Sequence, residues 1–503
     1  MIPACQNAGA LLMVDLPGPV LDDDTREHLR RHAIRAVCLF RKNIENFAQL
    51  AQLTAELRLV MGPDALIAID QEGGGVVRTT FFPFPPSAMS LGACGDPALA
   101  FEVGAATARG LASLGINWNF APVLDVNSNP ANPVIGDRAF GSDPQQVTPL
   151  ALAWLSGSLS QGVAGCVKHF PGHGDTHLDS HLALPRVDKT RGQLENCEFM
   201  PFQRAVSEAD VPAVMTAHIV YPALDETRPA TLSERVLSGL LREAWNYGGV
   251  IITDSMGMKA IDDHFGRGEA AVMALAAGAD MVMALGRRSA QEETLQTVER
   301  ALAEGRIEQS DTRRSRLRAL ARRFPSEKRA YDGVQREQDA RIMQAAWARG
   351  LTTYRDPQFP PPGASVTLVT LAEVPGEYVS EAGLSGAQLL RHLETLYDVR
   401  AHLVSGEVPV DWDALREERR PVILATTTRQ RFPGWRRARP DLHLALWNPY
   451  AVLDVDAPAL LSYGSRPEAV QAVLGYLRGE VAAGGRLPVL LETRSAEHPA
   501  QKP

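Results

Sequence analysis

Cysteine is scarce in this sequence. Five cysteines occur in 503 residues, and no two form a Cys-x-x-Cys pair. Neither a disulfide framework nor a zinc-ribbon pattern is therefore indicated. We expect reduced thiols buried in protein cores, which is typical of a cytoplasmic protein.

Long apolar runs and an excess of basic residues are also missing. No uncharged apolar run reaches the ~20 residues that a membrane-spanning helix needs. The first residues carry no basic group, and Asp15 interrupts their short apolar run. We therefore expect no signal peptide, no membrane partner and a cytoplasmic location. The net charge of −8 gives no basic surface for a nucleic-acid partner.

What is present is an alternation of short apolar runs with amphipathic stretches. Strands are predicted at 10–16, 35–40, 65–70, 116–126, 163–170, 213–220, 249–255 and 280–285. Eight such runs with helical sequence between them favour an α/β fold, a (β/α)₈ TIM-like barrel. A doubly wound open sheet is the alternative, because the fourth run is long and irregular.

The length predicts more than one domain. We place the catalytic barrel at 1–325, a linker of charged and then Pro-rich sequence at 326–364, and a smaller α/β sandwich domain at 365–492. Residues 493–503 are predicted to be a frayed tail. The second domain carries no comparable cluster of His, Asp and Lys, so a structural or gating role is expected for it.

The most informative stretch is 168–181, KHFPGHGDTHLDSH, where four of the twelve histidines recur at every fourth position. On a helix this spacing would make a metal-binding stripe. Pro171, Gly172 and Gly174 are incompatible with a helix, so we predict a strand that ends near His169 and continues as a polar loop.

Polar side chains follow most of the predicted strands. In a barrel, the carboxyl ends of all strands meet at one rim, where active sites are built. The residues at these ends or in the loops after them are Asp70, Arg78, Asp125, Arg138, Lys168, His169, Asp179, His181, His218 and Asp254. Their convergence on one rim predicts a ligand site.

Each of these residues also has an ordinary structural interpretation. Asp254 precedes Ser255 and could be a helix N-cap. His181 could make one loop hydrogen bond, although Asp179 two residues away suggests an imidazole–carboxylate pair. Arg78 and Arg138 could form surface ion pairs. Lys168 is costly to bury alone, which indicates a carboxylate or ligand partner.

Five segments together resemble the family 3 glycoside hydrolases, in the β-N-acetylhexosaminidase branch. They are IDQEGGGVVR, NFAPVLDVN, IGDRAFGSD, KHFPGHGDTHLDSH and TDSMGM, all in the predicted barrel. The resemblance implies a retaining exo-acting β-N-acetylglucosaminidase of cell-wall (peptidoglycan) fragments. Asp254 would be the nucleophile, and His181 the acid/base that Asp179 orients. The residues that would hold the sugar hydroxyls are Asp70, Arg78, Arg138, Lys168 and His169.

This chemistry is physically reasonable for these residue types. A retaining glycosidase needs one nucleophile and one proton donor on either side of the scissile bond. An imidazole has an unperturbed pKa of ~6.5 and can give and take a proton near neutral pH. No metal or other cofactor is expected, because the His-x-His spacing of barrel zinc hydrolases is missing.

Two other functions remain open from the sequence. An uncharged imidazole would let inorganic phosphate approach the glycosyl intermediate, so a β-N-acetylglucosaminide phosphorylase is one alternative. The other is a sugar-binding protein without catalytic activity, which the presence of Asp179, His181 and Asp254 argues against.

Overall fold

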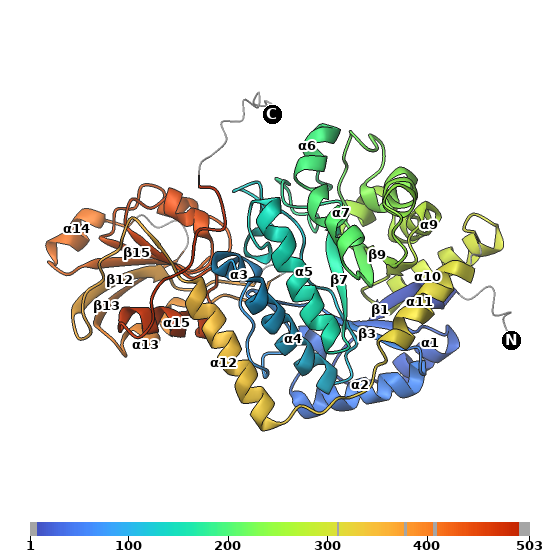
Figure 1. Cartoon of the computed structure of the whole chain (residues 1–503), viewed down its shortest axis with the longest axis horizontal. Coiled ribbons are helices and arrows are strands. Elements are labelled where there is room, and N and C mark those ends of the chain that lie inside the picture. Colours follow the sequence, from blue (N-terminus) through green and yellow to red (C-terminus); the bar gives the residue numbers. More distant parts are fainter. Residues whose placement is uncertain (1–7, 309–310, 377–379, 406–409, 492–503) are drawn as a thin grey trace.

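The structure is a computed structural model that describes residues 8–308, 311–376, 380–405 and 410–491. Two bodies lie side by side, an eight-stranded barrel and a smaller sheet domain, and helix α12 (Gly333–Gly350) runs between them (Figure 1). The predicted tail, 493–503, lies outside the described residues. No helix among the described residues has the length and apolar character to cross a bilayer.

All eight predicted strands are strands of a closed barrel. In chain order they are β1 (Leu12–Asp15), β2 (Ala36–Leu39), β3 (Leu66–Ile69), β6 (Trp118–Asn119), β7 (Ala164–Phe170), β8 (Ala213–Thr216), β9 (Val250–Ser255) and β10 (Met281–Met283). Neighbours pair in parallel, and β1 closes the ring on β10 through Leu12–Val282 and Met13–Met283. The barrel prediction is confirmed, and the doubly wound alternative is wrong because the sheet has no open edge.

The barrel helices follow the predicted amphipathic stretches. They are α1 (Asp23–Arg31), α2 (Phe47–Met61), α3 (Ala88–Cys94), α4 (Pro97–Ser113), α5 (Pro144–Ser160), α6 (Arg191–Asn196), α7 (Phe199–Glu208), α8 (Lys259–Phe265), α9 (Arg267–Ala277), α10 (Arg288–Ala303) and α11 (Asp311–Arg323), with a π-helical segment at Arg235–Ala244. Asp96 caps α4 by accepting from two amides of its first turn. A methyl group on Gly104 would lie 2.1 Å from the Trp154 carbonyl oxygen, so glycine is what lets α4 and α5 pack closely.

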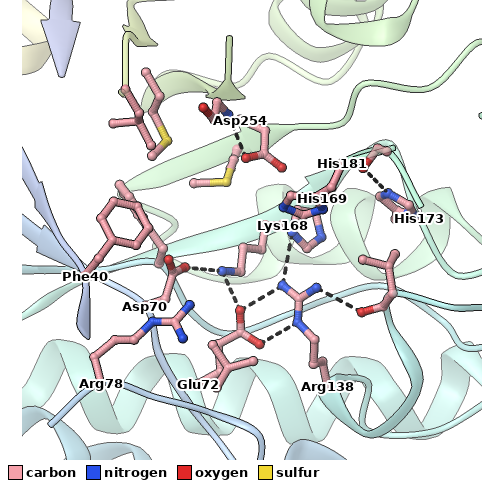
Figure 2. Close-up of a pocket in the computed structure, with 18 residues that line it drawn as sticks. Phe40, Asp70, Glu72, Arg78, Arg138, Lys168, His169, His173, His181 and Asp254 are labelled. Atoms are coloured by element: carbon pink, nitrogen blue, oxygen red, sulfur yellow. Dashed lines mark hydrogen bonds and ion pairs between the residues drawn. The ribbon is translucent and has the colours of Figure 1, made fainter. Parts of the chain in front are cut away.

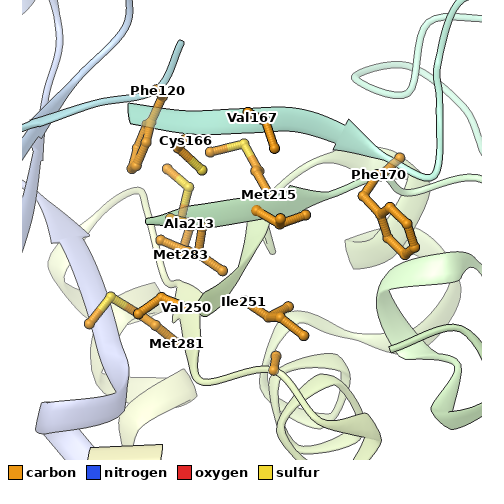
Figure 3. Close-up of a cluster of buried hydrophobic side chains, with 14 of the residues drawn as sticks. Phe120, Cys166, Val167, Phe170, Ala213, Met215, Val250, Ile251, Met281 and Met283 are labelled. Atoms are coloured by element: carbon orange, nitrogen blue, oxygen red, sulfur yellow. The ribbon is translucent and has the colours of Figure 1, made fainter. Parts of the chain in front are cut away.

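The interior of the barrel is a continuous apolar core. Side chains from β7, β8, β9 and β10 gather there, as Figure 3 shows for Cys166, Met215, Val250 and Met283. Every residue of β7 is buried, as expected for strands that are covered on both faces. The core thus anchors the strand ends that carry the polar residues.

The second domain contains a six-stranded sheet in the order β11-β16-β15-β14-β12-β13. Its strands are β11 (Thr352–Tyr354), β12 (Ser365–Leu371), β13 (Asp398–Val404), β14 (Val422–Thr426), β15 (Leu442–Ala445) and β16 (Ala459–Leu461). Its helices are α13 (Gly386–Leu393), α14 (Trp412–Glu417) and α15 (Pro467–Leu477). All neighbours are parallel except β11, which pairs antiparallel with β16.

The segment predicted as a linker, 326–364, is mostly part of the fold. It contains α12, which packs against α3, α4 and α15, and the edge strand β11. Its charged sequence is that of a helix with one exposed face, whose few buried residues include Met343 and Trp347. The Pro-rich piece, 355–364, is without helix or strand, as are residues 326–332 and Leu351. The limits 1–325 and 365–492 stay predictions.

Candidate active site

One pocket opens at the carboxyl ends of the barrel strands (Figure 2). Its lining combines apolar side chains from the barrel core with charged groups from the loops. The residues are Phe40, Asp70, Glu72, Val76, Arg78, Phe120, Val134, Arg138, Lys168, His169, His173, Ser180, His181, Met215, Asp254, Ser255, Met283 and Leu285. Seven of the eight predicted site residues line it, and Asp179 contacts it through His181.

Asp254 lies at the end of β9, where the apolar strand opens into the pocket. Burial alone would raise the pKa of this carboxyl group. The neighbouring His218, His169 and His181 and a 2.7 Å hydrogen bond from the Ser255 amide outweigh burial and lower the pKa. The carboxylate is therefore held ionised at the pocket wall. It caps no helix, since the next helix, α8, begins at Lys259.

His181 and Asp179 form the predicted imidazole–carboxylate pair. Nδ1 of His181 lies 2.8 Å from Oδ1 of Asp179, and the His181 amide donates to the same oxygen over 2.9 Å. Burial would raise the pKa of Asp179, but its bonds to His181 lower it. The aspartate thus fixes the ring, with Nδ1 protonated, on the same pocket that Asp254 lines.

A chain of ion pairs forms the opposite wall. Nζ of Lys168 lies 2.7 Å from Asp70 and 2.6 Å from Glu72. Arg138 binds both oxygens of Glu72, at 2.8 and 2.9 Å. Burial would protonate Glu72, but Arg138 and Lys168 lower its pKa, and burial of Lys168 is likewise outweighed by Asp70 and Glu72, which raise its pKa. Glu72, Lys168 and Arg138 are therefore charged.

His169 connects this wall to the barrel. Its Nδ1 lies 2.7 Å from Oδ2 of Asp125, and its Nε2 lies 3.3 Å from Nη2 of Arg138. Asp125 also accepts from the His169 and His173 amides, at 3.1 and 2.7 Å. A fully buried carboxylate with these donors fixes the turn after β7 and therefore the direction of the loop that carries His181.

The four histidines of 168–181 do not converge on one point. His169 binds Asp125, His173 binds Thr176 and Ser180, His177 contacts Asn129, and His181 binds Asp179. His169 and His181 both line the pocket, but different carboxylates orient them. His218 is buried behind Asp254, between Thr231 and the Ser255 carbonyl, which matches the structural role left open for it.

The sequence alone understated some residues. Glu72 is not among the residues predicted for the site, yet it joins Lys168 to Arg138 at the pocket wall. Apolar lining by Phe40, Met215 and Met283 was not predicted, because core and pocket positions look alike in a strand. Arg78 forms an ion pair over 2.7 Å with Glu381 of the second domain, and the sequence around Arg78 does not predict this partner.

Comparisons with known proteins agree with this arrangement. Residues 6–321 match the family described as "Glycosyl hydrolase family 3 N terminal domain". Beta-hexosaminidase A of Pseudoalteromonas piscicida is 40% identical over 289 residues, which span 52% of this chain and 48% of that protein. The chain thus covers about half the length of this relative.

Two solved structures are also similar. A glycoside hydrolase family 3 beta-N-acetylglucosaminidase from Paenibacillus sp. str. FPU-7 aligns over 98% of this chain and 99% of its own, with a TM-score of 0.87 and 32% identity. NagZ from Neisseria gonorrhoeae, in complex with N-trifluoroacetyl-D-glucosamine, aligns over 67% of this chain and 97% of its own, with a TM-score of 0.59 and 32% identity. Barrel, pocket and sequence therefore agree: the chain belongs to glycosyl hydrolase family 3 and is a glycoside hydrolase.

Proposed function

We propose that the protein is a retaining exo-β-N-acetylglucosaminidase. The observation that carries the proposal is that Asp254 and the His181–Asp179 pair line one pocket. One ionised carboxylate and one oriented imidazole are the two groups that a double displacement needs. The preference for a 2-acetamido sugar is supported by the relatives named beta-hexosaminidase and beta-N-acetylglucosaminidase.

In the first step, Asp254 attacks the anomeric carbon while His181 protonates the leaving oxygen. With Nδ1 held by Asp179, the proton comes from Nε2 of His181. In the second step, the neutral imidazole removes a proton from water, which attacks the anomeric carbon and releases Asp254. Bonds and protons balance in the two steps without a metal or other cofactor.

The charged wall would hold the terminal sugar. Lys168 and Arg138 present donors to hydroxyl oxygens, and Asp70, which is partly exposed, accepts from hydroxyl groups. Apolar Phe40, Met215 and Met283 would pack against the ring face. A pocket of this kind takes one terminal unit, which fits exo action.

A labelling experiment tests the roles most directly. A 5-fluoro-N-acetylglucosaminyl fluoride should form a slowly hydrolysed ester, and peptide mass spectrometry should find the label on Asp254. The wild-type protein should also release the aryl group from an aryl β-N-acetylglucosaminide. A label on another residue, or no release, contradicts the proposal.

The same assay in phosphate buffer separates hydrolysis from phosphorolysis. Hydrolysis predicts free N-acetylglucosamine with no sugar 1-phosphate, at any phosphate concentration. Accumulation of the 1-phosphate would favour the phosphorylase instead. Binding of N-acetylglucosamine without turnover would leave only a sugar-binding protein.

For the natural substrate, we propose peptidoglycan fragments that carry a terminal N-acetylglucosamine, handled during recycling in the cytoplasm. The test compares release of N-acetylglucosamine from a disaccharide muropeptide with release from chitobiose. A higher kcat/KM for the muropeptide is expected. Cell fractionation with an antibody against the protein checks the compartment.

A further inference from the structure

A buried arginine of the second domain reaches the loop that carries Arg138. Arg429 follows β14, and its Nε lies 3.2 Å from Oδ1 of Asp137. Its Nη1 donates to the Pro133 carbonyl over 2.8 Å, and its Nη2 donates to the Ile135 carbonyl over 3.0 Å. The side chains of Arg429 and Asp137 are only 3% and 2% exposed, so this contact is made inside the molecule.

The loop that Arg429 binds, residues 133–138, forms one wall of the pocket. Val134 and Arg138 both line the pocket. The Val134 carbonyl accepts from Nη2 of Arg429 on one side and, over 3.1 Å, from Nη1 of Arg138 on the other. Arg138 then binds Glu72 and contacts His169. A short path of hydrogen bonds therefore connects the second domain to the ion-pair wall.

Removal of the guanidinium would leave several groups without compensation. Burial raises the pKa of Asp137, although the charge of Arg429 partly offsets this. Three successive carbonyls, of residues 133 to 135, would also lose a donor in a place that water reaches poorly. A planar group with five donors fits this arrangement, whereas a lysine offers a single point.

We propose that Arg429 is a positioning residue for the active site, through which the second domain holds Arg138 at the sugar pocket. The inference rests on the proposed function for its kinetic readout. The second domain would then help to form the pocket wall, although Arg429 itself contacts no substrate.

The experiment compares two arginines of the same loop. In R429A, the donors to the loop at 133–138 are removed. R431A is the matched control, because Arg431 makes its ion pair with Asp454 inside the second domain, at 2.6 Å. We expect R429A to lower kcat/KM for an aryl N-acetylglucosaminide about 10- to 100-fold, since a displacement near 1 Å costs up to that much. R431A should stay within about threefold of wild type.

Chemical rescue distinguishes positioning from a general loss of fold. Guanidinium ion at millimolar concentration should restore part of the kcat/KM of R429A and none of that of R431A, while urea restores neither. R429K should lie between R429A and wild type, mainly through KM. The inference is overturned if R429A, folded by thermal melting, keeps wild-type kinetics. Should R429A not fold, R429K decides, and wild-type kinetics for it overturn the inference.

A measurement without substrate keeps the two proposals separable. Hydrogen exchange at the amides of 134–138 should be faster in R429A than in wild type and unchanged in R431A. If the wild-type protein has no N-acetylglucosaminidase activity, the proposed function fails while the exchange result still tests the inference. Equal exchange in all three proteins would contradict the positioning role.

Discussion

The barrel and the second sheet both present the carboxyl ends of parallel strands, but the two edges have different roles. On the barrel, these ends carry Asp70, Lys168 and Asp254 at an open pocket. On the second sheet, residues after β12, β14, β15 and β16 contact the barrel: Glu381, Arg429, Tyr450 and Tyr463. The crevice outside the strand ends of an open α/β sheet is the usual ligand site. In this protein the barrel occupies that position, so the second edge serves as a support for the first.

The charged residues of the two edges are hard to distinguish in the sequence. Both edges use buried ion pairs at strand ends. At the barrel edge the pairs surround a cavity, and at the second edge they surround another chain segment. We expect the two edges to respond differently to substitution, and four predictions follow from the largest effect to the smallest.

Loss of the barrel-edge carboxylate should abolish catalysis. Asp254→Ala should lower kcat at least about 10³-fold, because the variant lacks the carboxylate on which the proposed glycosyl ester forms. Added azide should restore turnover and give a glycosyl azide of inverted configuration. Asp263→Ala, an exposed aspartate in the neighbouring α8, is the control and should behave like wild type. Full activity of D254A contradicts the nucleophile assignment.

Loss of the central cation of the pocket wall should damage stability as well as binding. Lys168→Met leaves the buried Glu72 and the partly exposed Asp70 without their shared partner, which costs about 3–5 kcal/mol. Chemical denaturation measures this. Lys42→Met is the matched control: Lys42 pairs with Asp15 over 2.6 Å, but its own side chain is 47% exposed. The control should cost about 1 kcal/mol or less, and equal losses would show that burial is not what separates the two pairs.

Acid should destabilise the second domain through a histidine with no role in the pocket. Burial lowers the pKa of His443, in β15, to about 3. In the unfolded chain the pKa of His443 is ~6.5. Below that pH the unfolded chain binds a proton at this imidazole and the folded chain does not, so the free energy of unfolding falls as the pH drops from ~6.5 toward about 3. Between pH 6.5 and 5 this amounts to about 2 kcal/mol.

His443→Gln should remove that contribution. Its unfolding free energy should change less between pH 7 and pH 5 than that of the wild type, by about 2 kcal/mol, while kcat at pH 7 is unchanged. His173, in the barrel, has a pKa lowered to about 4 by burial, so part of the acid sensitivity should persist in this variant. An identical pH dependence for both proteins contradicts the assignment.

The smallest expected effect on stability is at the contact between the barrel and the second domain. A methyl group on Gly75 would lie 2.7 Å from Cζ2 of Trp447 and 3.3 Å from Cβ of Ser380. Gly75→Ala should therefore cost about 1–2 kcal/mol and raise KM, because the loop beside Arg78 must shift. Gly18→Ala, where nothing lies within 4 Å, should be neutral. If G75A is also neutral, the barrel and the second domain are packed less tightly at Gly75 than these distances indicate.

Much of the fold was predictable because it depends on local sequence. The eight apolar runs with helical sequence between them required no long-range information, and all eight are barrel strands. In the second sheet, β11 and β16 were not predictable as strands, because they have three residues each. A run this short has too little periodicity to be distinguished from a loop. For a related reason the sequence gives little sign that α12 packs within the fold, since a helix with few buried positions looks like solvated sequence.

The sequence by itself determined which residue types stand at the ends of the strands, and therefore that Asp254, His181 and Lys168 belong to one rim. This follows because a barrel brings all carboxyl ends together whatever the details of its packing. Only the tertiary structure decided which charges pair: Glu72 with both Lys168 and Arg138, Arg78 with Glu381, and Asp137 with Arg429. Such pairs join residues up to about three hundred positions apart, and a charge carries no local mark of its partner. The choice is made by distance and burial in the folded chain.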